Sequence, residues 1–131
     1  MKELRKISQE QLEEILLKHK LWLLDKEGGE KADLSYVDLA GADLTGANLR
    51  CANLIGANLE KADLRGTNLR GANLRCADLR EADLREADLG YAYLGYVYLE
   101  GANLTGVYLE DTNLEDAILK KANLTNTILQ E

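Results

Sequence analysis

Few residues of this chain belong to the types that perform acid–base, nucleophilic or metal chemistry. His19 is the only histidine among 131 residues, and its helical spacing is typical of a packed structural histidine rather than a general base. The two cysteines, Cys51 and Cys76, form no CxxC metal motif. The glycines recur with a regular period and form no phosphate loop. We therefore expect no enzyme, no catalytic residue, no cofactor and no metal. An enzymatic or small-molecule-binding role would need a ligand that the sequence does not nominate.

Charge and composition narrow the function classes further. The chain carries 16 basic and 23 acidic residues, for a net charge of −7 and a pI near 4.8. This balance argues against broad affinity for nucleic acid or anionic lipid, so neither is an expected partner. No apolar run approaches the ~20 residues of a membrane span, and residues 1–6 lack the apolar stretch of a secretory signal. We expect a cytoplasmic protein with reduced thiols.

Leucine recurs at every fifth position from Leu34 to Leu129, which makes 20 leucines without a gap. A small residue stands two positions before each leucine, and it is alanine in 14 of the 20 repeats. Asp or Asn directly precedes the leucine in 15 of the 20. The unit Ala-(Asp/Asn)-Leu-x-x fills residues 32–131. A strict period over most of a chain is typical of a repeat architecture in which each unit packs on its neighbours.

A period of five residues fits neither a straight helix nor a flat strand. Successive leucines would lie about 140° apart around an α-helix, and they would alternate between the two faces of a strand because five is odd. Ala and Leu, two residues apart, share one side of an extended segment, so the next two residues must turn the chain. Repeated turns in one sense wind the chain into a coil, whose number of sides the period leaves open. Glycine suits such corners and occupies seven of them: Gly41, Gly46, Gly56, Gly66, Gly71, Gly101 and Gly106.

The Ala-(Asp/Asn)-Leu-x-x run resembles the pentapeptide-repeat family over 100 of the 131 residues. The resemblance implies an all-β solenoid, a right-handed quadrilateral β-helix with four pentapeptides per coil. Twenty repeats then give about five coils. The central leucine and the small residue two positions before it fill the interior, and the Asp or Asn between them points outward.

Residues 1–31 precede the repeats and predict an α-helical cap for one end of the coil stack, where core and strand edges would otherwise be exposed. Ser8 and Gln11 have the spacing of a capping box. Gly28 and Gly29 are expected to end the helical region, as one helix or two short ones. Apolar and aromatic residues follow helical spacing between these signals: Leu12, Ile15, Leu16, His19, Trp22 and Leu23.

Near the C-terminus the outward position becomes apolar and supplies one part of a candidate interaction surface. With four repeats per coil, Tyr98 stacks on Ile118 and Tyr108 on Ile128. This rim and the uncapped end favour a partner surface or a homodimer, while the alternative interpretation is a ladder that stiffens the last coils. The residues concerned are Tyr93, Tyr98, Tyr108, Ile118 and Ile128.

A second part of the candidate surface is acidic. Asp43, Asp63 and Asp83 are spaced by 20 residues and should form one outward column. Five arginines, at every fifth position from Arg65 to Arg85, form a belt around the middle of the rod. The alternative to a binding role is a solvated, charge-balanced surface.

Two functions follow from these features. The first is a non-catalytic scaffold or protein–protein interaction protein with an unknown protein partner. The second is an acidic DNA mimic acting on DNA gyrase or topoisomerase, as the resemblance implies for some family members. This chain departs from those members because it lacks central phenylalanines, is shorter and carries the arginine belt.

Overall fold

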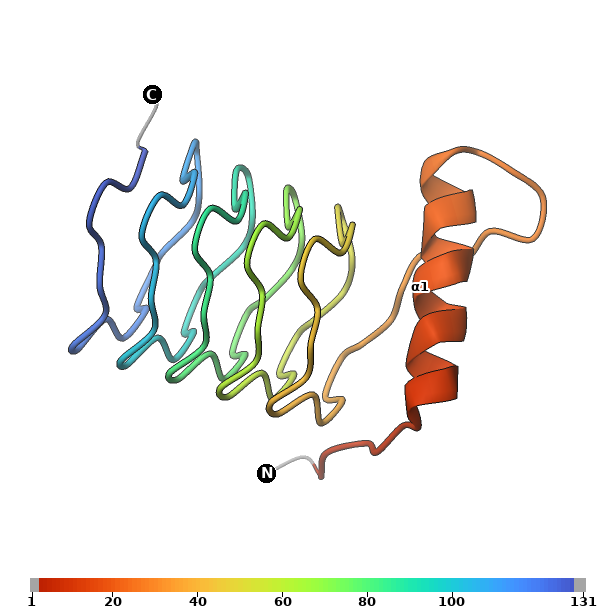
Figure 1. Ribbon diagram of the computed structural model, residues 1–131, viewed down its shortest axis with the longest axis horizontal. Coiled ribbons are helices and arrows are strands. Elements are labelled where there is room, and N and C mark those ends of the chain that lie inside the picture. Colours follow the sequence, from red (N-terminus) through yellow and green to blue (C-terminus); the bar gives the residue numbers. More distant parts are fainter. Residues whose placement is uncertain (1–2, 129–131) are drawn as a thin grey trace.

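The computed structural model describes residues 3–128, in which a single helix precedes a stack of similar coils (Figure 1). The helix, α1, spans Gln9–Leu23 and lies at the N-terminal end of the stack. None of the helical structure in residues 3–128 is long and apolar enough to cross a lipid bilayer.

The coils are held in register by parallel β-bridges between residues 20 positions apart. These bridges join the residue before each leucine to its counterpart one coil later, from Asp33–Asn53 through Tyr108–Ile128. In each bridge two backbone hydrogen bonds form, such as Leu34 N–H to the Asn53 carbonyl at 2.7 Å and Asn53 N–H to the Ala32 carbonyl at 3.0 Å. A register of 20 residues is four pentapeptides, as expected from the resemblance. The extended segments are so short that each contact is an isolated bridge.

The leucine and the small residue of each repeat form the core. Every central leucine from Leu34 to Leu109 is buried. Thr67 takes the place of alanine inside the rod, and its hydroxyl donates to the Leu44 carbonyl at 3.0 Å, so its polar group is satisfied. The expectation of full burial fails at the last described repeats, where Leu124 is 42% exposed. No coil stacks on the C-terminal side of that leucine within the described residues.

The Asp or Asn before each leucine has a structural role that the sequence did not reveal. Its side-chain oxygen accepts a hydrogen bond from the backbone N–H two residues later, which closes the corner of the coil. Asn73, for example, accepts from Arg75 N–H at 3.2 Å. This corner bond is present at all fifteen such residues. Local capping of the backbone therefore explains why these two residue types dominate the position.

The second corner residue of each repeat adopts a left-handed backbone conformation. The seven glycines predicted for corners all have positive φ, between 64° and 71°. The remaining described corners adopt the same conformation with other residues, such as Lys61 at φ 59° and Glu81 at φ 58°. Inter-coil hydrogen bonds hold these residues in place, for example Lys61 N–H to the Arg80 carbonyl at 3.0 Å. Glycine is thus favoured at this corner but is not required.

The predicted start of α1 is confirmed, and the helix is continuous rather than divided in two. Ser8 accepts from Gln11 N–H at 3.1 Å, and the Gln11 side chain accepts from Ser8 N–H at 2.8 Å. The helix ends at Leu23, before Gly28 and Gly29. Leu12 and His19 are buried toward the first coil, whereas the indole of Trp22 is 39% exposed.

Candidate interaction surface

His19 is a structural histidine, as its spacing predicted. Its Nδ1 accepts from the Ala32 N–H at 2.9 Å, and its Nε2 lies 2.8 Å from the Arg50 carbonyl, to which it donates. These contacts fix the neutral Nε2–H tautomer and join α1 to the first coil. Burial lowers the pKa of His19; the Arg50 carbonyl opposes this shift and Lys31 adds to it. With both nitrogens bonded to backbone, the imidazole is not available as a general base.

The two cysteines lie apart, because their spacing of 25 residues is one coil and one further repeat. Cys51 is half-buried and Cys76 is exposed, and both are free thiols on different edges of the rod. Among residues 3–128, no group of three or more His, Cys, Asp or Glu side chains is placed to hold a metal ion.

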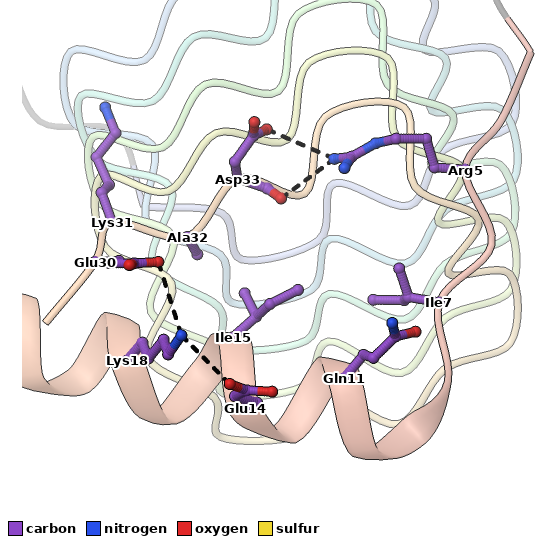
Figure 2. A pocket seen from close by; sticks show the side chains of 10 residues that line it. All are labelled: Arg5, Ile7, Gln11, Glu14, Ile15, Lys18, Glu30, Lys31, Ala32 and Asp33. Atoms are coloured by element: carbon purple, nitrogen blue, oxygen red, sulfur yellow. Dashed lines mark hydrogen bonds and ion pairs between the residues drawn. The ribbon is translucent and has the colours of Figure 1, made fainter. Parts of the chain in front are cut away.

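A cleft of about 400 Å³ lies between α1 and the first coil (Figure 2). Its charged walls are largely paired with one another: Lys18 lies 3.3 Å from Glu14 and 4.0 Å from Glu30. The Arg5 guanidinium donates to the Ser35 carbonyl at 2.9 Å and lies 3.8 Å from the Asp33 carboxylate. The Arg5 contacts join the N-terminal segment to the first coil, and the Lys18–Glu30 pair joins α1 to the segment that precedes this coil. We therefore interpret the cleft as part of the contact between α1 and the first coil.

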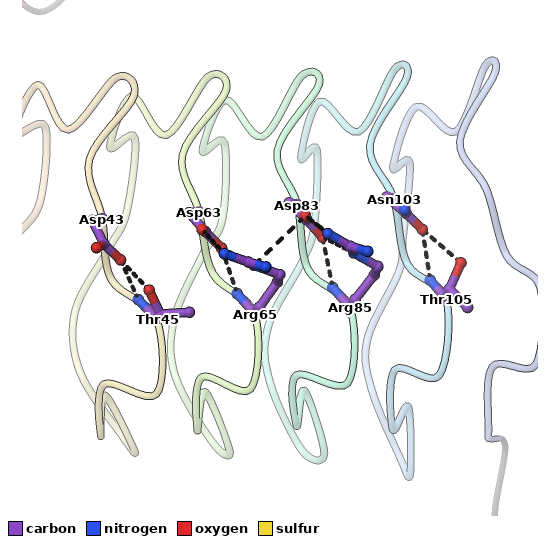
Figure 3. Close-up of polar contacts among 8 residues, drawn as sticks. All are labelled: Asp43, Thr45, Asp63, Arg65, Asp83, Arg85, Asn103 and Thr105. Atoms are coloured by element: carbon purple, nitrogen blue, oxygen red, sulfur yellow. Dashed lines mark hydrogen bonds and ion pairs between the residues drawn. The ribbon is translucent and has the colours of Figure 1, made fainter.

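The acidic column, Asp43, Asp63 and Asp83, lies along one side of the rod as predicted (Figure 3). Asp63 and Asp83 each bind the arginine two residues later: Arg65 Nη2 lies 2.6 Å from Asp63 Oδ2, and Arg85 Nη2 lies 2.6 Å from Asp83 Oδ2. The guanidinium bonds are the first cause of the lowered pKa of Asp63 and of Asp83.

Asp43 is the member of the acidic column without an arginine in its own repeat. It accepts from the Thr45 hydroxyl and from the Thr45 N–H, and these bonds lower its pKa. All three carboxylates of the column therefore accept hydrogen bonds from their own corners, and two of them are paired with cations.

The arginine belt is paired in most of its members. Arg80 binds Asp78 at 2.6 Å in the manner of Arg65 and Arg85, and Arg70 lies 3.3 Å from Glu110, two coils away. Arg75 has no carboxylate oxygen within 4.0 Å among the described residues. The belt thus mainly balances local charge.

The predicted apolar residues differ from the acidic column, because their side chains are not paired with a cation as Asp63 and Asp83 are. Tyr93, Tyr98 and Tyr108 are 51%, 44% and 47% exposed, Ile118 is 44% exposed, and Ile128 is half-buried. None of these side chains can accept the corner bond that Asp and Asn provide.

The structure does not gather these five residues into a single patch. Tyr98 bridges to Ile118, and Tyr108 bridges to Ile128. Because ten residues make half a coil, Tyr98 and Tyr108 lie on opposite sides of the rod. Tyr93 is one repeat from Tyr98 and occupies the neighbouring side.

Two exposed tyrosines escaped the sequence analysis because they occupy corner positions instead of the position before leucine. Tyr91 is 47% exposed and Tyr96 is 51% exposed. Their positions alternate along the chain with those of Tyr93 and Tyr98. We call the resulting aromatic surface, which covers two adjacent sides and their corners, the tyrosine face: Tyr91, Tyr93, Tyr96, Tyr98 and Ile118.

The family model and the solved structures that this chain resembles all belong to pentapeptide repeat proteins. The family model for pentapeptide repeats matches residues 30–66, 62–95 and 92–130. A solved pentapeptide repeat protein from the thylakoid lumen of Arabidopsis thaliana is 35% identical, with a TM-score of 0.73, over 76% of this chain and 69% of that chain. A pentapeptide repeat protein from the cyanobacterium Cyanothece is 34% identical over 78% of this chain and 67% of its own, with a TM-score of 0.41.

A more distant structural match is QnrB1, a plasmid-mediated fluoroquinolone resistance protein. It is 20% identical, with a TM-score of 0.41, over 77% of this chain and 59% of that chain. The search of curated proteins returned no match.

Proposed function

The chain belongs to the pentapeptide-repeat family, and from this premise we propose that it is a non-catalytic protein-binding rod whose contact surface is the tyrosine face. The observation that carries the proposal is the replacement of Asp or Asn by exposed aromatic residues at Tyr93 and Tyr98. At both positions the chain gives up a corner bond and leaves an aromatic ring about half exposed. We propose that contact with a partner is the reason for both changes.

The chemistry of the tyrosine face also favours protein binding. Tyrosine is enriched in the energetically important centres of protein interfaces, because a rigid ring contributes contact area at a low entropic cost. The four tyrosines occupy outward or corner positions within residues 91–98, on a rod that regular hydrogen bonds hold rigid. Such a preorganised surface loses little conformational entropy on binding.

The acidic column supports a partner less well than the tyrosine face does. Asp63 and Asp83 are already paired with Arg65 and Arg85, so a basic partner would have to compete with intramolecular ion pairs. This pairing also weakens the likeness to the charge of duplex DNA, on which the gyrase alternative depends. We therefore favour the interaction function over mimicry.

Capture of partners from lysate of the source organism tests the proposal. The bait is the wild-type protein beside two variants, Tyr93→Ser/Tyr98→Ser and Asp43→Asn/Asp63→Asn/Asp83→Asn. The second variant is the control, because Asn keeps the corner bond while the column loses its charge. We expect a specific partner to be lost with the serine variant and retained with the asparagine variant.

Other outcomes would redirect the assignment. A partner lost only with the asparagine variant would contradict the tyrosine face, and gyrase as that partner would support mimicry. Recovery of the chain itself alone would indicate self-association, which sedimentation of the purified protein would quantify. We keep a homodimer through the C-terminal coils as a second proposal, and its contact would include Tyr108 and Ile128.

The proposal includes an architecture for the whole chain. Pentapeptide repeat proteins are right-handed β-helices, and we infer this winding here. We infer five coils over residues 32–131 and a helical cap over residues 1–31. Residues 129–131 of the coils and residues 1–2 of the cap lie outside the described part of the chain. The 20-residue register and the contacts of His19 with Ala32 and Arg50 support this division.

We retain the cytoplasm as the proposed compartment. The free thiols of Cys51 and Cys76 are compatible with a reducing environment. Fractionation of the source cells, with detection of the untagged protein, tests this assignment.

A further inference from the structure

One corner of the rod shows how a guanidinium group is held by a tyrosine and a glutamate. Arg70 lies with its Cζ 4.8 Å from the centre of the Tyr91 ring and its Nη2 3.3 Å from Glu110. The Tyr91 hydroxyl donates to the same carboxylate at 3.1 Å. Gly90 leaves the path open, because an added Cβ there would lie 2.5 Å from Arg70 Nη1. Aromatic ring, carboxylate and glycine together form a seat for one arginine.

The next corner repeats this arrangement five residues later, with Tyr96, Glu115 and Gly95 in the places of Tyr91, Glu110 and Gly90. Here the arrangement opens into a hollow of about 270 Å³. Arg75 takes the place of Arg70, with its Nε 3.6 Å from where an added Cβ at Gly95 would stand, but it forms no ion pair with Glu115, in contrast to Arg70 with Glu110. We call this space the edge hollow; its lining is Arg75, Tyr93, Gly95, Tyr96, Asn113 and Glu115.

The charge around the edge hollow favours a cation. Glu115 lines the hollow and Asp116 lies beside Tyr96, so two carboxylates stand at this corner against the single guanidinium of Arg75. The neighbouring carboxylates, Asp116 first, raise the pKa of Tyr96, whereas Arg75 opposes that shift. The Tyr93 and Tyr96 rings provide aromatic surface in the same wall.

We propose that the edge hollow receives an arginine side chain of the protein partner, stacked on Tyr96 and paired with Glu115. The inference rests on the proposed function, since the hollow lies within the tyrosine face. Arginine fits better than lysine because its planar guanidinium both stacks on a ring and binds a carboxylate through two N–H groups. The partner is therefore a protein that presents an exposed arginine.

Titration of the full-length protein with a small probe tests the site directly. The probes are N-acetyl-arginine amide, its lysine analogue and its neutral citrulline analogue, followed through backbone amide signals by NMR. We expect arginine amide to shift Gly95, Tyr96 and Glu115 saturably, lysine amide to bind more weakly, and citrulline amide to give no saturable shift. Equal shifts with citrulline, or shifts confined to other parts of the rod, would overturn the proposal.

Three substitutions sharpen the test. Glu115→Gln should weaken arginine binding about two- to fivefold, the range for one exposed ion pair. Arg75→Ala should tighten binding by a similar factor, because it removes a like charge. Glu10→Gln makes the same charge change as Glu115→Gln on α1 and should leave binding unchanged. An unchanged affinity in Glu115→Gln, or equal weakening in Glu10→Gln, would refute a local site.

Capture of the partner with each variant distinguishes the arginine site from the tyrosine face as a whole. If a captured partner is lost with Tyr93→Ser/Tyr98→Ser but binds Glu115→Gln normally, the tyrosine face remains the contact surface and the arginine assignment is wrong. If the tyrosine substitutions have no effect on capture, the proposed function itself fails.

Discussion

The residue before each central leucine illustrates how one side chain can serve the backbone. Asp and Asn occur there because their oxygen accepts from the N–H two residues later, at a corner where that N–H has no partner in a helix or a long strand. The bond depends on a short side chain with an acceptor oxygen, which both residues have. Charge is secondary for the fold, so the acidity of the rod can vary independently of its architecture.

This role predicts a specific response at Asn73. Asn73→Ala removes the acceptor for Arg75 N–H and should lower the free energy of unfolding by about 0.5–1.5 kcal/mol. Asn73→Asp keeps an acceptor oxygen and should cost less than half as much. Urea unfolding of the three proteins measures both values. Equal losses in the two variants would show that the corner bond contributes nothing.

His19 predicts a pH dependence at the junction of α1 and the first coil. Its folded-state pKa lies below the ordinary value of 6.5, so the unfolded chain binds a proton more readily. The contribution of neutral His19 to the free energy of unfolding should therefore be fully present above about pH 6.5. It should be lost as the pH drops from there toward the folded-state pKa. Protonation of Nδ1 would also remove the acceptor for the Ala32 N–H.

The free energy of unfolding, measured between about pH 7 and pH 5, checks the His19 prediction. This window lies above the ordinary pKa of the carboxylates, so their titration contributes little. His19→Gln is the control, because its amide can accept from Ala32 and donate to Arg50 without titrating. The free energy of unfolding of His19→Gln should change less across this window than that of the wild type. An identical pH profile in the two proteins would contradict the assigned role.

Helix α1 is held against the first coil by apolar packing, in which Ile15 and Leu16 join Leu12, and by a few specific polar contacts. Leu12 contributes to the core, His19 bonds two backbone groups of the first coil, and Arg5 binds carbonyls of the same coil from the preceding segment. The His19 ring also stacks on Trp22, with centroids 5.5 Å apart. Trp22, the only tryptophan, therefore reports on the docking of α1.

Leu12→Ala should weaken this docking. Loss of a buried leucine contact costs about 2–5 kcal/mol in well-packed sites, and we expect the lower end because Leu12 lies at the edge of the core. The Trp22 fluorescence transition should move to lower denaturant concentration than the far-UV circular dichroism transition of the coils. Coincident transitions in both proteins would show instead that helix and coils unfold as one unit.

Some features of the fold could be predicted from the sequence and others could not, because only some of them depend on local spacing. The five-residue period predicted the inward leucines and the corner glycines, and the capping-box spacing of Ser8 and Gln11 predicted the helix start, because each depends on local spacing. The sequence did not predict the corner bond of residues such as Asn73, nor the exposure of Trp22, because these depend on backbone geometry and on packing between elements. The ion pair of Arg70 with Glu110 was also missed, since it spans two coils and depends on the open path over Gly90.

The tyrosine face was predicted in part. Tyr93, Tyr98 and Ile118 were found because they break the pattern before leucine. Tyr91 and Tyr96 were missed because the corner position tolerates many residue types and gives no contrast. A comparison of each corner with its counterparts one coil away would have found them.

The rod as a whole is a stack in which each coil buries the next. Leu64 and Leu84 are fully buried in its middle. Lysine at either position would place an unpaired charge in the core and should unfold the rod or cost several kcal/mol. Arg75→Ala removes an exposed side chain without an ion pair and should cost roughly 0.5 kcal/mol or less. Thermal unfolding of the three variants tests the register, and comparable losses in all of them would contradict it.

We infer that the regular hydrogen-bonded coils specify the fold and that Tyr93 and Tyr98 depart from the repeat for the sake of contact with a partner. The free energy of unfolding of Tyr93→Asn/Tyr98→Asn, measured relative to the wild type, tests this inference. Asparagine restores the corner bond at both positions, so we predict a stability that is unchanged or up to about 1 kcal/mol higher. A loss of about 2 kcal/mol or more would show that the tyrosines form a stabilising ladder and would contradict the claim.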